Sequence, residues 1–291
     1  MGDALKVTAI EQFSYPGEFF GVKMIETPPY DIKLYDIPRV LFHEFVKRNS
    51  NLFKDKAAVY ILLNKDVMDD GRREVYIGKT NNIFARFDWH QKNKEFWTNA
   101  LIFTSNYFED SIILYLENEL TAIARMNDTL NVLTKSTQNN NQLRDKNRLL
   151  CSQYIELISA ILSNLSYWNS TQENNKENSK YDEVGSRPIE FYLHTKALDE
   201  PQKLVVVGDR YRITKGTKIS KIENPSLLNH RAYGPRNEKL KQEGVISRDK
   251  GEFLKDYDFD APSEPACIIS GSSVNGQKVW KTKSGVSMKD C

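Results

Sequence analysis

A polar stretch near the middle of the chain is the feature that most restricts how this sequence can fold. Residues 169–186, NSTQENNKENSKYDEVGS, contain almost no large apolar side chain. Such a composition cannot bury enough apolar surface to offset the conformational entropy that ordering would cost. We therefore predict a linker at 169–187, between a domain that ends at residue 168 and a second domain that spans 188–291.

Length and composition agree with two folded domains. The chain has 291 residues, and 40% of them are hydrophobic, which suffices for a core in each part. No stretch approaches the roughly 20 apolar residues that a membrane-spanning helix needs. The first residues, MGDALKVTAIEQ, lack the pattern of a secretory signal, and the three cysteines are far apart and odd in number. We expect a cytoplasmic protein with no membrane partner.

Charge alone leaves the partner open. The net charge is only +2, but between Arg210 and Lys255 twelve Lys and Arg residues stand against five Asp and Glu residues. Such a patch attracts a phosphate backbone through counterion release, and an ordinary solvated surface can have the same composition. Three aromatic residues of the second domain that have basic neighbours, Tyr211, Tyr233 and Trp280, could stack on bases, although core packing is the better explanation for Trp280.

Hydrophobic periodicity predicts mixed helices and strands in both domains. Residues 1–35 look β-rich, and Pro38 marks a helix start. In the first domain we then predict a hairpin of two strands with a polar turn, a helix capped by Thr80, Asn81 or Asn82, a third strand and two amphipathic helices. Their ranges are 57–64, 74–79, 83–91, 100–105, 110–125 and 143–165. In the second domain we predict strands within 191–220, a helical stretch at 225–244 that is interrupted around Gly234-Pro235, and strand-like pieces in the tail from residue 266.

The order of polar residues in the first domain suggests a hydrolytic site. Tyr60 and Tyr76 lie near the middle of the two hairpin strands, and Arg86 and His90 are four residues apart on the next helix, hence on one face. Arginine matches phosphate geometry, and a carboxylate on the following helix could hold a divalent cation. A tyrosine in a strand is nevertheless more often a packing residue than a catalytic one. Periodicity cannot choose the carboxylate, because Glu117 and Glu119 both border the apolar stripe of their helix.

These motifs resemble those of the GIY-YIG nuclease superfamily, which is named for its two strand motifs. The first motif here is Ala58-Val59-Tyr60, which keeps the tyrosine but not the family's glycine and isoleucine. Tyr76-Ile77-Gly78 matches the second motif fully and continues as Lys79-Thr80-Asn81-Asn82-Ile83. The similarity extends over 57–125 and again over 188–282, where it is to a bacterial subgroup whose C-terminal domain has no assigned function. The departure at Ala58 removes no reacting group.

The resemblance implies a set of site residues. The helix arginine of the family corresponds to Arg86, a frequent histidine to His90, and the metal-binding glutamate of a YLE-type segment to Glu117. Tyr60, Tyr76, Arg86, His90 and Glu117 would be catalytic, with Mg²⁺ or Mn²⁺ on Glu117. Tyr60 would be the general base, and Arg86 would bind the scissile phosphate. Substrate-binding or supporting positions would be Gly78, Lys79 and Asn131.

The resulting expectation is an α+β protein. Residues 51–168 would form a GIY-YIG-type nuclease domain with a trailing helix, built on a small antiparallel sheet flanked by helices. Residues 1–50 would be an extension that packs on this core, and 188–291 a mixed α+β domain that binds or targets DNA. The predicted activity is Mg²⁺-dependent hydrolysis of DNA phosphodiester bonds, with RNA not excluded. The alternatives are a restriction or anti-phage nuclease of defined specificity, and a nucleic-acid-binding adaptor with a weak nuclease domain.

Overall fold

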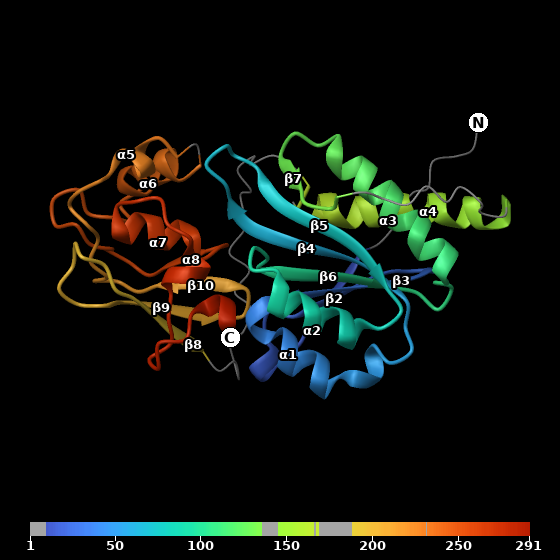
Figure 1. Ribbon diagram of the computed structural model, residues 1–291. Helices are drawn as coiled ribbons and strands as arrows, with labels where there is room; N and C mark the ends of the chain where they lie inside the picture. Colours follow the sequence, from blue (N-terminus) through green and yellow to red (C-terminus); the bar gives the residue numbers. More distant parts are fainter. Residues whose placement is uncertain (1–9, 136–144, 166, 169–187, 231) are drawn as a thin grey trace. The chain divides into compact units, whose positions relative to one another are not determined.

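The computed structural model describes residues 10–135, 145–165, 167–168, 188–230 and 232–291 (Figure 1). The predicted linker at 169–187 lies outside the described residues. By internal contacts the chain divides into two compact units. Unit 1 comprises the described parts of 1–15, 22–64 and 73–182, and unit 2 those of 16–21, 65–72 and 183–291. The domain limits that the sequence suggests stay a prediction.

Unit 1 is built on a seven-stranded sheet in the order β1-β2-β3-β6-β4-β5-β7. β2, β3, β6 and β4 pair antiparallel with their neighbours, whereas β7 pairs parallel with β5. The sheet is thus larger than the small antiparallel sheet predicted, because residues from the first part of the chain add three strands to it. The strands are β1 (Glu11–Ser14), β2 (Lys23–Thr27), β3 (Tyr30–Pro38), β4 (Ala58–Val67), β5 (Arg73–Thr80), β6 (Asn99–Thr104) and β7 (Leu130–Val132).

Helices cover both faces of this sheet, α1 and α2 on one and α3 and α4 on the other (Figure 1). β4 is apolar along most of its length because it is buried on both sides. Val59, Ile61 and Leu63 belong to the core that α3 and α4 complete. Tyr60 alternates with them, so its side chain lies on the α2 face, where its ring contacts Phe87. The helices are α1 (Arg39–Arg48), α2 (Ile83–Asn93), α3 (Asp110–Arg125) and α4 (Asp145–Asn164), with a 3₁₀ turn at Ser50–Leu52.

The helix starts follow local signals in the sequence. Pro38 is the residue before α1, as predicted, since its fixed φ suits a helix start. Asn82 caps α2 through Oδ1, which accepts from the N–H of Ala85 at 3.0 Å. This cap fixes where α2 begins, and therefore where Arg86 and His90 lie.

Unit 2 has its own four-stranded antiparallel sheet, in the order β11-β10-β9-β8. Unit 2 also contains helices, most of them short. Both units thus combine a sheet with helices, so the predicted α+β class is confirmed for the chain as a whole. The strands are β8 (Ile189–Leu193), β9 (Gln202–Val207), β10 (Arg210–Ile213) and β11 (Tyr257–Phe259). The helices are α5 (Pro225–Leu228), α6 (Tyr233–Gln242), α7 (Ser263–Ser270) and α8 (Gly276–Val279), with 3₁₀ turns at Gly17–Phe19 and Met288–Asp290.

Two predictions for unit 2 are wrong. The tail forms the helices α7 and α8 rather than strands, because α7 is buried on nearly all sides and so shows no helical period. The break in the helical stretch 225–244 lies between Leu228 and Tyr233, and not at Gly234-Pro235. Pro235 is tolerated in the first turn of α6, where a backbone N–H has no partner within the helix.

None of the helices in the described part of the chain combines the length and the apolar character that crossing a membrane requires.

Candidate active site

The two hairpin strands and the helix after them bring four of the predicted site residues together in unit 1. Tyr60 lies in β4 and Tyr76 in the neighbouring β5, and their ring centroids are 6.3 Å apart. Arg86 and His90 follow one turn apart on α2, which packs over the same face of the sheet. The imidazole of His90 contacts both tyrosine rings edge-on, with its centroid 5.3 Å from that of Tyr60 and 5.5 Å from that of Tyr76.

Hydrogen bonds join these four side chains around the Tyr60 hydroxyl. Arg86 Nε donates to Tyr60 Oη at 2.8 Å, and the same guanidinium donates through Nη2 to Tyr76 Oη at 3.3 Å. His90 Nε2 lies 2.7 Å from Tyr60 Oη. Arginine suits this position because its planar fork can bond two hydroxyls at once, which a lysine amine on a flexible stem does less well.

His90 is neutral near pH 7. Burial, followed by the positive charges of Arg86 and Lys94, lowers the pKa of its imidazole to about 3. Nδ1 has no hydrogen-bond partner among the described residues. The neutral imidazole shares one hydrogen bond with the Tyr60 hydroxyl, and either Nε2 or Oη is its donor, depending on the tautomer.

The Tyr60 hydroxyl is poised between opposing influences. Burial is the main one and raises the pKa of the phenol above its usual value, with Tyr76 and Glu117 acting in the same direction. The hydrogen bond and the positive charge of Arg86 lower the pKa and offset part of this effect. The oxygen thus accepts one hydrogen bond from Arg86 and shares a second with His90.

Glu117, on α3, faces this cluster. Burial raises the pKa of its carboxyl group, while the charges of Lys79 and Arg86 and a hydrogen bond from the Lys79 backbone N–H lower it. Its charge also acts on Tyr60, so the two groups are within electrostatic reach of each other. Glu119 instead acts on Tyr115. The tertiary structure thus separates the two carboxylates that helical periodicity left equivalent.

Gly78 keeps room for the Tyr60 hydroxyl. A Cβ atom at this position would lie 2.4 Å from Tyr60 Oη and 2.5 Å from its Cζ, far inside van der Waals contact. Because the Tyr60 ring is fully buried, it cannot swing away freely. The glycine of the second motif is therefore explained by close packing against the tyrosine of the first.

We expect Gly78→Ala to destabilise unit 1 by about 1–3 kcal/mol through overpacking. It should also displace Tyr60 Oη from Arg86 and His90. Urea denaturation would measure the loss of stability. Wild-type stability in this variant would contradict the packing argument.

The remaining predicted positions have different surroundings. Lys79 lies beside Glu117, because its backbone N–H donates to the Glu117 carboxylate. Asn131 lies in β7, where it pairs with Glu74 near the start of β5, whereas Gly78 lies near the end of that strand. Thr134, which no sequence motif singles out, supports the second motif. Its Oγ1 accepts from the N–H of Ile77 at 2.8 Å and donates to the Ile77 carbonyl at 2.9 Å.

Sequence reasoning also missed two lysines near the site. The Lys94 amino group lies 3.9 Å from the centroid of the Tyr76 ring. Burial, then Arg86 and Lys135, lower the pKa of Lys94, so three cations share this region. Lys94 follows α2, and Arg39 holds it there by donating to its carbonyl at 2.8 Å. Neither Lys94 nor Lys135 belongs to a motif. They are 41 positions apart in the sequence and come together only in the folded unit.

The donor set allows a cation with few protein ligands. No group of three or more His, Cys, Asp or Glu side chains suited to a metal occurs within the described ranges. Burial raises the pKa of the half-buried Glu117 carboxyl group. A nearby cation would therefore stabilise this group in its charged form. Mg²⁺ commonly binds through one or two carboxylates and keeps several waters, so Glu117 fits it.

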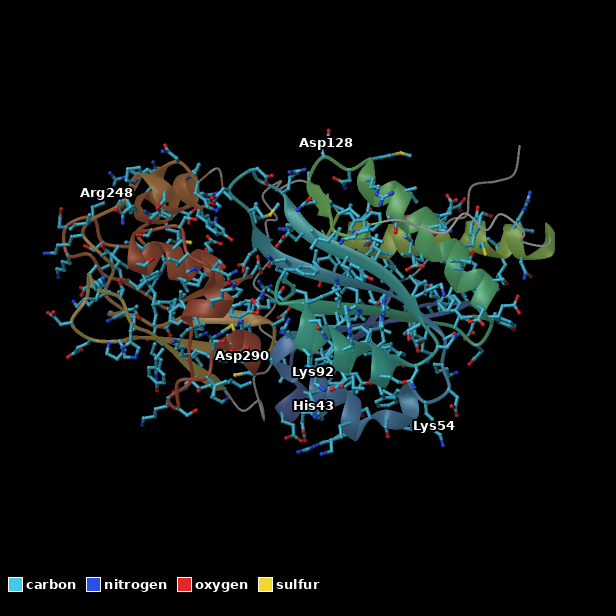
Figure 2. All side chains as sticks on the ribbon, in the orientation of Figure 1. His43, Lys54, Lys92, Asp128, Arg248 and Asp290 are labelled. Carbon is cyan, nitrogen blue, oxygen red and sulfur yellow. The ribbon has the colours of Figure 1, made fainter. Side chains whose placement is uncertain are left out.

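The basic stretch of unit 2 is largely neutralised within the unit. Seven of the twelve basic residues between Arg210 and Lys255 form ion pairs with described carboxylates, so their charges are not unopposed. Figure 2 labels one of them, Arg248, which pairs with Glu238 at 2.5 Å. The pairs are Arg210–Asp260, Arg212–Asp258, Lys218–Glu252, Arg236–Glu264, Lys239–Glu243, Lys241–Glu223 and Arg248–Glu238.

The three aromatic residues considered for base stacking in unit 2 are buried instead. Tyr211 and Tyr233 are each 5% exposed and Trp280 is fully buried. Trp280 Nε1 donates to the Pro262 carbonyl at 2.9 Å, and Tyr233 stacks on His230 with centroids 4.1 Å apart. These side chains therefore pack the core of unit 2, so base stacking by them is contradicted, and the core packing expected for Trp280 is confirmed.

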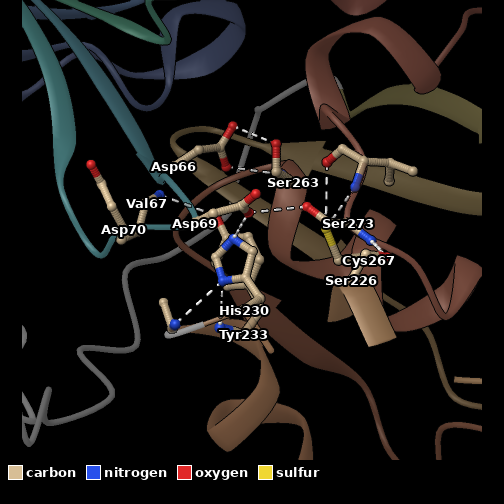
Figure 3. A network of polar contacts seen from close by, with 12 residues as sticks. Asp66, Val67, Asp69, Asp70, Ser226, His230, Tyr233, Ser263, Cys267 and Ser273 are labelled. Atoms are coloured by element: carbon tan, nitrogen blue, oxygen red, sulfur yellow. Dashed lines mark hydrogen bonds and ion pairs between the residues drawn. The ribbon is translucent and has the colours of Figure 1, made fainter. Parts of the chain in front are cut away.

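A buried polar network in unit 2 is structural rather than catalytic (Figure 3). His230 Nδ1 accepts from the backbone N–H of Tyr233 at 3.1 Å, so Nε2 carries the proton and lies 3.1 Å from Asp69 Oδ1. Ser273 Oγ donates to the same Asp69 oxygen and not to the imidazole. A hydrolytic triad needs the histidine between the serine and the acid, and here the acid is in the middle.

Comparison with known proteins assigns no activity. A family model described as Domain of unknown function (DUF4357) matches residues 193–291, which is about a third of the chain. Neither the curated proteins nor the solved structures contain a match.

Proposed function

We propose that this chain is a metal-dependent endonuclease of the GIY-YIG type that hydrolyses phosphodiester bonds in DNA. The observation that carries the proposal is the surroundings of Tyr60 Oη. This oxygen accepts from Arg86 Nε, lies 2.7 Å from His90 Nε2 and is within electrostatic reach of Glu117. Such a cluster joins a base, a phosphate-binding group and a carboxylate at one point, which phosphodiester hydrolysis requires.

The local charge supports an anionic substrate. Among the described residues, four positive side chains act on the titrating groups of the site, and Glu117 supplies the one carboxylate. An excess of positive charge in a partly buried site attracts a phosphate backbone and binds it through charge-assisted hydrogen bonds. The four positive residues are Lys79, Arg86, Lys94 and Lys135.

In the proposed mechanism Tyr60 acts as general base. The N–H donors of Arg86 and His90 on Tyr60 Oη favour the phenolate, which then accepts a proton from the attacking water. As hydroxide adds to phosphorus, the P–O bond to the leaving oxygen breaks and that oxygen takes up a proton from solvent, while the guanidinium of Arg86 stabilises the charge that develops on the phosphate oxygens. Tyr76, held by the same guanidinium, orients the phosphate or the water.

Mg²⁺ or Mn²⁺ would be held by the Glu117 carboxylate. When bound, a divalent cation polarises the phosphate and lowers the pKa of groups around it, including water. The backbone N–H of Lys79 fixes the Glu117 carboxylate, since it donates to it. One carboxylate is consistent with a single-metal site that is completed by substrate and water.

Replacing Glu117 by glutamine tests the metal assignment. We expect Mg²⁺-dependent cleavage to fall at least about 100-fold, because the neutral amide binds the cation poorly. The matched control is Glu119→Gln, the same change two residues away on α3, which should cleave at the wild-type rate. The assay uses plasmid, linear single-stranded DNA, branched DNA and RNA, with and without EDTA.

The outcomes separate the alternatives. Equal loss in both variants, or no loss in Glu117→Gln, would remove Glu117 as the ligand. Cleavage of RNA in preference to every DNA would replace the substrate class. Absence of cleavage of all four substrates by the wild type would remove the enzyme proposal and leave a nucleic-acid-binding adaptor.

A further inference from the structure

Trp89 differs from the other tryptophans of the chain in its exposure. It lies on α2, next to His90, and 48% of its side chain is exposed to solvent. Trp97 and Trp280 are fully buried, and Trp168 is 7% exposed. Leaving half of so large an apolar surface in water forgoes stabilisation that burial would supply. An exposed tryptophan beside a cluster of cations therefore suggests a ligand.

The neighbours of Trp89 are the groups that would bind phosphate. The Arg86 guanidinium lies 5.6 Å and the Lys94 amino group 5.9 Å from the centroid of the indole ring. Lys94 also lies over Tyr76, so the indole and the phenol share one cation. The indole meets the His90 ring edge-on, with centroids 5.2 Å apart, which fixes its orientation next to the proposed active site. An aromatic surface bordered by cations is what single-stranded nucleic acids bind.

Other charges on α2 do not compete for this position. Asp88 precedes Trp89 but forms an i,i+4 ion pair with Lys92 on the outer side of the helix, where both side chains are well exposed. Figure 2 labels Lys92 on this helix. Arg39 binds the carbonyls of Gln91 and Lys94, so the end of α2 that carries Lys94 is held in place before any ligand binds.

We propose that Trp89 is a stacking platform for an unpaired base, next to a backbone that Arg86 and Lys94 bind. The inference rests on the proposed function and narrows its substrate to a strand with unpaired nucleotides at or next to the cleaved bond. In an intact duplex both faces of each base are covered by neighbours, so the indole could stack only on a base that has left the helix or on an end. A base in an unpaired strand can stack on the indole without first leaving a duplex.

Binding of oligonucleotides, measured without cleavage, tests the proposal. The probes are a twelve-residue oligothymidylate and the duplex that it forms with oligoadenylate, both in EDTA. We expect the single strand to quench the tryptophan fluorescence of the wild type, since Trp89 is the exposed indole. Trp89→Ala should weaken binding of the single strand by about 5- to 150-fold, the equivalent of one lost stack, and that of the duplex less than about threefold.

Two further variants separate stacking from a general surface effect. Trp89→Phe keeps an aromatic ring, so it should bind the single strand within about tenfold of the wild type while losing the quenching. Tyr107→Ala removes an aromatic side chain that is 62% exposed in the same unit but away from α2, and it should change neither probe. Circular dichroism of each variant controls for folding.

Failure of the inference and failure of the nuclease proposal are distinguishable. Equal weakening of both probes in Trp89→Ala, no weakening at all, or no binding of the single strand by the wild type would overturn the inference, whether or not the protein cleaves DNA. The opposite outcome is quenching by the single strand that requires Trp89, in a protein that cleaves none of the substrates in Mg²⁺. It would support the stacking site and contradict the nuclease proposal.

Discussion

Tyr60→Phe is expected to lower the cleavage rate about 100- to 10,000-fold, the range that a positioned general base contributes. The phenyl ring keeps the packing against Phe87 but removes the oxygen that accepts from Arg86 Nε and contacts His90 Nε2. Loss of this oxygen leaves Arg86 Nε and His90 Nε2 without their common partner, so the free energy of unfolding should also fall by about 1–3 kcal/mol. Single-turnover kinetics in Mg²⁺ and urea denaturation measure the two effects separately.

The pH dependence of the wild type has a definite sign. Burial raises the pKa of Tyr60 above its usual value, so near neutral pH the phenolate is the minor form. The rate should therefore increase with pH, up to about tenfold per unit, until the pKa in the substrate complex is reached. Tyr60→Phe should lose this dependence. A pH-dependent residual rate in the variant would show that another group is the base.

The matched control for this change is Tyr154→Phe. Tyr154 is also a buried tyrosine of unit 1, and its hydroxyl lies 2.9 Å from Ser105 Oγ. Its replacement should cost stability of similar size but leave cleavage unchanged. If the Tyr154 variant lost as much activity as the Tyr60 variant, the loss would reflect the fold and not the chemistry.

Arg86→Lys is expected to lower the cleavage rate about 100- to 1,000-fold, the cost of one donor that stabilises transition-state charge. Lysine keeps the positive charge, but its single nitrogen cannot reproduce the pair of bonds to Tyr60 and Tyr76 and also meet a phosphate. The loss should therefore appear in kcat more than in KM, since charge attraction to the substrate remains.

Arg48→Lys is the control for the arginine change. Arg48 is exposed on α1, where it pairs with Glu44, and surface pairs of this kind contribute at most about 1 kcal/mol. Activity and stability should stay at wild-type values. An Arg86→Lys variant with wild-type kcat would contradict the assignment of charge stabilisation to the guanidinium.

Much of the architecture of unit 1 could be predicted from the sequence because its signals are local. The apolar run from Ala58 forms β4, the cap at Asn82 starts α2, and the stripe of α3 faces the core. The size of the sheet could not be predicted in this way. The parallel pairing of β7 with β5 depends on contacts between distant segments, and so does the addition of the three strands β1, β2 and β3 to the sheet.

Unit 2 shows where local signals fail. The residues of α7 are apolar all round because the helix is buried, so a short strand and a short helix have the same pattern. The basic stretch from Arg210 looked like a phosphate-binding patch when only charges were counted. Three of its seven carboxylate partners, Asp258, Asp260 and Glu264, lie outside the stretch over which the charges are counted.

Local signals suffice to predict the α+β class, the hairpin and helix that carry Tyr60, Tyr76, Arg86 and His90, and the spacing of the last two on one helix face. These features depend on side-chain periodicity and caps, which act over a few residues. The folded structure was needed to show that Glu117 rather than Glu119 acts on Tyr60, and that Lys94 and Trp89 border the same site. Such choices depend on how a helix is rotated against a sheet and where a distant segment returns, and both are set by packing across the whole unit.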